Sequence, residues 1–269
     1  MKSKKPLLSE ILGTFLLVFF GCSAVATAVA MGAQVGIFQV AIVWGFGLMV
    51  AILLTAKNSG AHLNPAITIA MALHRNFAWK RVPGYIFAQF VGAFAAAGLI
   101  YALYGGAIAS FEAANGITRG AEGSEASAMI FGEYFPNPSG KPITDEARAS
   151  ISNLHAFLAE LIGTALLALA IFGFTDRNNT EVPSRMIPFG IGLTLTVLIS
   201  LLAPISQGGF NPARDFAPRL LSTLVGWGNL PFSLNGLGWL TVYIIAPCLG
   251  AIIGGYAYKL FLKPGYKAK

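Results

Sequence analysis

Long apolar runs, separated by short polar segments, dominate the pattern of residues along this chain. A helix that crosses a bilayer needs about 20 consecutive, mostly apolar residues. Runs of that length lie at about 6–31, 36–56, 83–106, 154–175, 186–204 and 237–262. The pattern therefore predicts an all-α membrane protein with six transmembrane helices.

Two further apolar segments are too short to cross the membrane. One runs from Asn64 to Leu73, after the second long run, and the other runs from Asn211 to about Leu221, after the fifth. Ten residues of α-helix reach about 15 Å, which is half the thickness of the hydrocarbon core. We expect both segments to be half-helices.

The two halves of the chain resemble each other. The stretch LSEILGTFLLVFFG, which begins at Leu8, is echoed by LAELIGTALLALAIFG, which begins at Leu158. Each half reads as two spans, a half-helix and a third span, and an odd number of spans per half requires opposite insertion of the two halves. We therefore expect one transmembrane domain over residues 1–269. Its inverted repeats would lie at about 6–106 and 154–262, joined by an extracytoplasmic loop at about 107–153.

The composition also indicates a membrane protein. Hydrophobic residues make up 55% of the chain and charged residues 11%, whereas a soluble domain carries about 25% charged residues. The net charge of +7 does not indicate nucleic acid as a partner, because no basic face with interleaved aromatic residues occurs. Lysines before the first apolar run resemble a signal peptide, but the glutamate in that run recurs in the second half, so we expect the first span to be retained.

An even number of spans places both termini on one side of the membrane. Most of the 18 Lys and Arg residues would lie on that side: Lys2, Lys4, Lys5, Lys57, Arg75, Lys80, Arg81, Arg177, Arg185, Lys259, Lys263, Lys267 and Lys269. Positive residues concentrate on the cytoplasmic side, so we expect cytoplasmic termini in a cell membrane, which is the inner membrane in a Gram-negative bacterium. The segment 107–153 would lie outside as an irregular loop.

Each short segment begins with the same polar triplet, Asn64-Pro65-Ala66 or Asn211-Pro212-Ala213. Asn is a favoured N-cap and Pro suits the first helical position, so each triplet starts a half-helix near the bilayer midplane. The positive ends of the two half-helices would face each other. Non-helical backbone at that depth must be buried in protein or line a water-filled cavity. We expect an acceptor ladder from the carbonyls of Gly60, Ala61, His62, Gly209 and Phe210, with the asparagine amides as donors at its centre.

Arg214 directly follows the second triplet. A charged side chain at membrane depth is costly unless it faces a bundle interior or water, so we expect Arg214 to line the cavity. The paired helix ends would orient each water at the centre and break a continuous proton wire, and the fixed charge of Arg214 would repel cations.

Two such triplets, the second followed by an arginine, in a six-span inverted repeat resemble the aquaporin (major intrinsic protein) family. The stretches SGAHLNPA and NPARDFAPRL resemble its aquaglyceroporin branch, represented by the glycerol facilitator, as do Asp215, Arg219, Pro247 and the long outer loop. The resemblance implies a passive channel for water and small uncharged solutes, glycerol foremost, that excludes protons and ions. It also implies a homotetramer in the lipid bilayer.

The family narrows its pore at four positions, which map here onto Trp44, Ile199, Gly208 and Arg214. The glycerol facilitator has glycine where this chain has Ile199 and phenylalanine where it has Gly208, so the large and the small residue are exchanged. Trp44 and Ile199 would still form an apolar face opposite Arg214, which suits a solute with carbon on one side and hydroxyls on the other. A water-only filter normally carries histidine at the position of Ile199.

Two interpretations stay open for Glu10 and Glu160, which lie in spans at matching places of the two repeats. Carboxylates in the membrane are functional suspects, so one interpretation makes them proton-coupling groups. The other makes them structural struts that accept hydrogen bonds from unpaired N–H groups of the non-helical segments, and their symmetric placement favours it. For His62, a pH-gating role stands beside local packing of the ring.

Several functional classes are disfavoured. No Walker motif is present, and no nucleophile, base and orienting residue occur at catalytic spacing, so we expect neither an ATP-driven pump nor an enzyme. Cys22 and Cys248 lie in apolar stretches, and we expect no cofactor and no metal site. The alternative to a channel is a proton-coupled secondary transporter of a small polar solute, since inverted repeats with broken helices occur there too.

Overall fold

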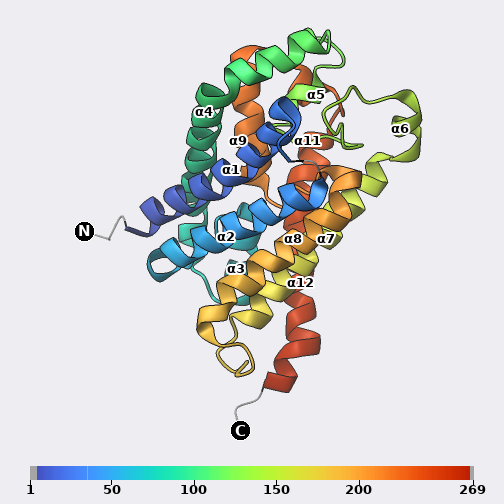
Figure 1. The fold of residues 1–269 in the computed structure, drawn as a ribbon. Helices are drawn as coiled ribbons and strands as arrows, with labels where there is room; N and C mark the ends of the chain where they lie inside the picture. Colours follow the sequence, from blue (N-terminus) through green and yellow to red (C-terminus); the bar gives the residue numbers. More distant parts are fainter. Residues whose placement is uncertain (1–4, 35, 267–269) are drawn as a thin grey trace.

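The computed structural model describes residues 5–34 and 36–266. Within these ranges the chain forms helices joined by turns and loops, with no β-strand (Figure 1). The prediction of an all-α protein is therefore confirmed. Lys2, Lys4, Lys267 and Lys269, which contribute to the predicted orientation, lie outside the described residues.

Among the described residues, six apolar segments are long enough to cross a bilayer, as the sequence predicts. Five of them are built around α1 (Lys5–Met31), α2 (Ile37–Ser59), α4 (Val82–Ala114), α7 (Asn153–Phe174) and α8 (Ile187–Ser206). The sixth runs through α11 (Gly238–Leu240), η4 (Thr241–Ile245), α12 (Ala246–Ala257) and η5 (Tyr258–Leu262). α4 continues beyond its predicted end near residue 106, because the stretch that follows is rich in alanine and keeps a high helix propensity.

Two short helices begin at the polar triplets. α3 (Pro65–His74) and α9 (Pro212–Ser222) each have an asparagine as N-cap and a proline in the first turn. The side-chain oxygen of Asn64 accepts a hydrogen bond from the N–H of the alanine in its own triplet at 2.8 Å, and Asn211 does the same at 3.0 Å. These caps satisfy N–H groups that the start of a helix leaves without a partner. Local sequence thus determines where both half-helices begin.

The two repeats use equivalent helix contacts. α1 packs against α2 and α4 in the first repeat, and α7 packs against α8 and α12 in the second. Each half-helix also packs against the last long helix of the other repeat, α3 against α12 and α9 against α4, while α2 packs against α8. The repeats are thereby interlocked in one bundle (Figure 1).

Glycines allow the tightest helix crossings. A Cβ at Gly92 in α4 would collide with the backbone of Ile11 in α1, and a Cβ at Gly250 in α12 would collide with the backbone of Leu161 in α7. The same crossing therefore recurs in both repeats. Gly98 differs, because a Cβ there would meet no heavy atom outside its own helix within 4 Å.

The segment between the repeats is more ordered than the sequence predicts. The end of α4, α5 (Glu125–Ala128) and α6 (Asp145–Ser150) replace part of the expected irregular loop. Phe131 and Tyr134 of this segment are fully buried. The order arises from tertiary burial of aromatic side chains, which local pattern does not reveal. The remaining short helices are η1 (Trp79–Arg81), η2 (Ser184–Met186), η3 (Thr223–Trp227), α10 (Leu230–Ser233) and η6 (Lys263–Tyr266).

The close crossing of α7 and α12 predicts a stability difference between two glycine substitutions. Gly250→Ala should lower the thermal midpoint of the purified protein, because overpacking a tight contact costs about 1–3 kcal/mol. Gly98→Ala is the matched control and should leave the midpoint unchanged or raise it slightly, since alanine favours a helix by about 0.5–1 kcal/mol over glycine. Thermal unfolding in detergent measures both, and equal midpoints would contradict the proposed crossing.

Candidate functional site

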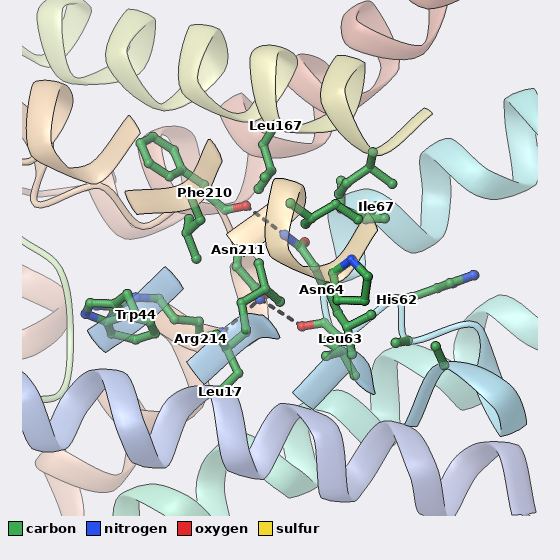
Figure 2. A pocket seen from close by; sticks show the side chains of 18 of the residues that line it. Leu17, Trp44, His62, Leu63, Asn64, Ile67, Leu167, Phe210, Asn211 and Arg214 are labelled. Atoms are coloured by element: carbon green, nitrogen blue, oxygen red, sulfur yellow. Dashed lines mark hydrogen bonds between the residues drawn. The ribbon is translucent and has the colours of Figure 1, made fainter. Parts of the chain in front are cut away.

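The two triplets meet at the centre of the bundle through reciprocal hydrogen bonds. Nδ2 of Asn64 donates to the carbonyl of Phe210 at 2.8 Å, and Nδ2 of Asn211 donates to the carbonyl of Leu63 at 2.8 Å (Figure 2). Each amide nitrogen carries two N–H donors. One donor ties the asparagine to the opposite repeat, and the second remains for a molecule in the cavity beside it. Both asparagines line that cavity, and their roles as pore donors stay a prediction.

The backbone before each triplet is non-helical and strained at matching positions. Residues Gly60, Ala61 and Leu63 have φ of 91°, 50° and 52°, and residues Gln207, Gly208 and Phe210 have φ of 64°, 77° and 52°. A left-handed backbone is costly for residues other than glycine and persists only where the surroundings hold it. Both segments therefore need external partners.

Buried carboxylates supply those partners in both repeats. Glu10 accepts hydrogen bonds from the N–H groups of His62 at 3.0 Å and Leu63 at 2.8 Å. Glu160 accepts hydrogen bonds from the N–H groups of Gly209 at 2.9 Å and Phe210 at 2.6 Å. This geometry is the one expected of struts, and it gives both carboxylates a structural task.

A pair of tyrosines completes the support, and sequence reasoning missed it. The hydroxyl of Tyr85 donates to the carbonyl of Ser59 at 2.9 Å, and that of Tyr243 donates to the carbonyl of Ser206 at 3.0 Å. The two contacts occupy equivalent places in the repeats. Aligning the third spans of the two halves would have been the only sequence signal for them.

Two cavities lie end to end along the bundle. The cavity lined by both triplet asparagines, called the inner cavity, has a volume of about 280 Å³. The cavity lined by residues of the segment between the repeats, called the outer cavity, has a volume of about 610 Å³. Three residues line both cavities, namely Trp44, Ile199 and Arg214, so the cavities meet at these side chains. Gly208 lines only the inner cavity. Three of the four predicted filter positions are thus at the junction, and Gly208 lies on its inner side.

The inner cavity has walls of two kinds. The predicted ladder residues line it: Gly60, Ala61, His62, Gly209 and Phe210. Apolar side chains also line it, among them those of Leu48, Ile52, Leu167, Ile171 and Leu195. A molecule inside can therefore meet backbone acceptors and hydrocarbon together.

The arrangement at the junction differs from the expected one. The guanidinium carbon of Arg214 lies 4.2 Å from the ring centroid of Trp44, so the two side chains stack instead of facing each other (Figure 2). Stacking of a guanidinium on an aromatic face is favourable. A Cβ at Gly21 would collide with the same indole, so Trp44 lies between α1 and Arg214. The expected apolar face opposite Arg214 is therefore reduced to Ile199 and the edge of Trp44.

The segment between the repeats, at about 107–153 and called the outer segment after its predicted side, contributes a charged residue to the site, which sequence reasoning also missed. Glu133 is fully buried and forms an ion pair with Arg214. Its backbone N–H donates to Asp215 at 2.7 Å, and its carbonyl accepts a hydrogen bond from Arg219. Burial raises the pKa of the Glu133 carboxyl, while the charge of Arg214 opposes that rise. No motif surrounds Glu133, so only the tertiary fold identifies it.

His62 lies at the edge of the inner cavity with its ring engaged. Its Nδ1 is 3.3 Å from the hydroxyl of Thr68, and its ring centroid is 4.7 Å from that of Phe77 and 5.1 Å from that of Tyr85. These contacts favour local packing over a gating role. In the described part of the chain, no group of three or more His, Cys, Asp or Glu side chains could hold a metal ion.

Comparisons with known proteins agree with this architecture. The family model described as "Major intrinsic protein" matches residues 1–258. A glycerol uptake facilitator protein of Pseudomonas aeruginosa is 40% identical over 256 residues, which is 95% of this chain and 88% of that protein. A propanediol uptake facilitator of Salmonella typhimurium is 36% identical, over 94% of this chain and 92% of that protein. The X-ray structure of the aquaglyceroporin from Plasmodium falciparum matches with a TM-score of 0.81 and 28% identity, over 97% of this chain and 98% of that one.

The strut geometry of Glu160 leads to a test of its role. Glu160→Gln replaces one acceptor by an amide that cannot accept from Gly209 and Phe210 together, and an unsatisfied buried group costs about 1–3 kcal/mol. We expect a lower thermal midpoint and lower flux, with no response to a proton gradient in either protein. Glu122→Gln, at an exposed position, is the control. Wild-type flux that accelerates with an imposed proton gradient, and loses this response in Glu160→Gln, would favour a proton-coupled transporter.

Proposed function

The chain belongs to the major intrinsic protein family, and on this basis we propose that it is a passive channel for glycerol and water that excludes protons and ions. The observation that carries the proposal is the pair of cavities that meet at Trp44, Ile199 and Arg214, with both triplet asparagines lining the inner one. Two cavities that meet at a shared set of side chains suit the flux of a solute down its gradient. Such flux requires no alternating conformations.

The walls of the inner cavity support glycerol as a solute. Glycerol carries hydroxyls along one side of a short carbon chain, and the cavity combines backbone acceptors with apolar side chains. A site of this kind matches both sides of the solute. The relatives named as glycerol and propanediol uptake facilitators support the same class of small polyol.

Trp44, Ile199, Gly208 and Arg214 form the proposed selectivity constriction. Nη1 of Arg214 is buried and has no hydrogen-bond partner among the described residues, so the proposed constriction keeps one unused donor. Ile199 offers an apolar surface in place of the histidine of a water-only filter. Gly208 adds no side chain and keeps the inner side of the junction open.

Exclusion of protons would take place at the triplets. The N-terminal ends of α3 and α9 meet there, and each end carries a partial positive charge. A water at that point would turn its oxygen toward Asn64 and Asn211, so that it cannot pass a proton along the file. The carboxylates of Glu10 and Glu160 would hold the strained segments and take no part in transport.

We further propose that the protein is a homotetramer with both termini in the cytoplasm, and that it is neither an enzyme nor dependent on a cofactor. The distribution of Lys and Arg along the chain supports this orientation. The segment 107–153 would then cover the outer mouth of a single domain made of repeats at about 6–106 and 154–262. The tetramer rests on family membership.

Stopped-flow light scattering on proteoliposomes tests the function. Glycerol and water should both enter faster than into empty vesicles, without saturation and without a pH gradient. Saturable uptake that needs a proton gradient would contradict a passive channel.

A histidine at the junction should shift selectivity toward water. Ile199→His replaces apolar surface by a polar group, and an unmatched polar contact costs about 1–3 kcal/mol. At about 1.4 kcal/mol per tenfold, the ratio of glycerol flux to water flux should fall by about one order of magnitude. Both fluxes are measured in the same vesicles, so that the amount of protein cancels.

Ile199→Leu is the control for this experiment and should keep the wild-type ratio, because it preserves the apolar volume. If Ile199→His also leaves the ratio unchanged, Ile199 does not face the permeating solute.

A further inference from the structure

Glu133 stands at the outer face of the junction, beside the arginine of the proposed filter. It lines the outer cavity together with Arg214, and its carboxylate pairs with that guanidinium. Besides this ion pair, its two oxygens accept no hydrogen bond from the described residues, and Nη1 of Arg214 donates none. Fully buried oxygens and a fully buried donor with remaining capacity thus lie next to each other at one mouth of the junction.

The carboxylate is not needed to fasten the outer segment. Backbone groups do this, because the N–H of Glu133 donates to Asp215, its carbonyl accepts from Arg219, and the N–H of Tyr134 donates to Gln207 at 2.7 Å. A side chain at Glu133 could change without breaking any of these bonds. Its charge and its free acceptor capacity therefore call for another explanation.

In the second repeat, a glycine lies beside the Glu133 side chain. The position equivalent to His62, given by the offset 211 − 64 = 147, is Gly209. A Cβ at Gly209 would lie 3.4 Å from Cγ of Glu133 and 3.3 Å from Cδ1 of Tyr243, so any side chain there would pack directly against the Glu133 side chain. Gly209 leaves this space to Glu133.

The charged cluster is confined to one end of the pore. By the same offset, Arg214, Asp215 and Arg219 correspond to Ile67, Thr68 and Ala72 in the first repeat. The inner end therefore has no counterpart of the arginine and no charge to balance. Only the end with Arg214 needs a counter-ion, and there Glu133 of the outer segment supplies it.

The chemistry of the two groups is complementary. A guanidinium can only donate hydrogen bonds, and a carboxylate can only accept them. A hydroxyl does both, so an alcohol at the junction can accept from Arg214 and donate to Glu133. The pair also carries no net charge, whereas Arg214 alone would attract small anions.

We propose that Glu133 is a further selectivity residue of this channel, which in its ionised form supplies the hydroxyl acceptor of the filter and cancels the charge of Arg214. The inference rests on the proposed function and adds a residue to it. It also shifts the barrier against cations from Arg214 toward the facing ends of α3 and α9, because the arginine is neutralised by its partner.

The test compares Glu133→Gln with wild type and with Glu125→Gln, which changes another buried carboxylate of the outer segment. Glu125 accepts from the N–H of Ile143 at 2.9 Å and does not line either cavity. Glycerol and water fluxes are measured in proteoliposomes at about pH 9, because burial raises the pKa of Glu133 to about 8. Each flux is repeated with external nitrate, a small planar anion that a bare guanidinium can bind.

Glu133→Gln should lower the ratio of glycerol to water flux by about tenfold and should make glycerol flux sensitive to nitrate. Wild type and Glu125→Gln should keep the ratio and should not respond to nitrate. A variant with only a structural defect would lose both fluxes together and would gain no anion sensitivity. A wild-type ratio in Glu133→Gln, or the absence of nitrate sensitivity, would overturn the inference.

If Glu133→Gln is not recovered in folded form, the same measurements on Glu133→Asp test the inference. The shorter carboxylate keeps the charge but withdraws from the junction, so the ratio should fall while nitrate remains without effect. A wild-type ratio in Glu133→Asp would overturn the inference. Failure of the proposed function looks different, because wild type itself would then conduct neither glycerol nor water above empty vesicles.

Discussion

Backbone groups that stop pairing in the middle of a bilayer must find other partners, because hydrocarbon offers none. Both helix interruptions in this chain meet that constraint in the same way. Glu10 and Glu160 accept from the unpaired N–H groups, and Tyr85 and Tyr243 donate to the last carbonyls before the turns. The asparagines then tie each segment to the other repeat. The residues that carry the remaining acceptors line the inner cavity, and in the proposed channel a passing water or hydroxyl would complete their hydrogen bonding.

This supporting structure follows the repeat, while the residues of the proposed selectivity constriction lie where the two halves differ. Struts, tyrosines, caps and left-handed residues occur in matched pairs, which suits a pore that must be supported equally from both sides. Arg214 has an apolar counterpart in Ile67, and Gly209 has a large one in His62. Near these two departures, Arg214 forms an ion pair with a carboxylate of the outer segment. A scaffold that is matched in both repeats thus carries a charged pair at one end.

The sequence predicted the spans, the half-helices and the triplets because each depends on local signals, namely apolar length, an asparagine cap and a proline in the first turn. It also offered structural struts as one of two interpretations for Glu10 and Glu160, and the observed hydrogen bonds to backbone N–H groups fit that interpretation. Contacts between segments that are distant in the chain could not be predicted from the sequence. The ion pair of Glu133 joins residues 81 positions apart (214 − 133 = 81), and the stack of Arg214 on Trp44 depends on the space left at Gly21. The different surroundings of Gly92 and Gly98 were not predictable either, because glycine spacing does not reveal which face of a helix is covered.

The exchange of large and small residues at the junction has a physical consequence for the strained segment. Gly208 has a φ of 77°, in a stretch where Gln207 and Phe210 already hold left-handed conformations without being glycine. A phenylalanine at position 208 would be a further non-glycine residue in a left-handed conformation, which costs about 1–2 kcal/mol. Ile199 instead lies inside the regular helix α8, where a bulky side chain meets no such penalty. Placing the apolar group on the helix therefore narrows the junction without further strain on the backbone that carries the triplet.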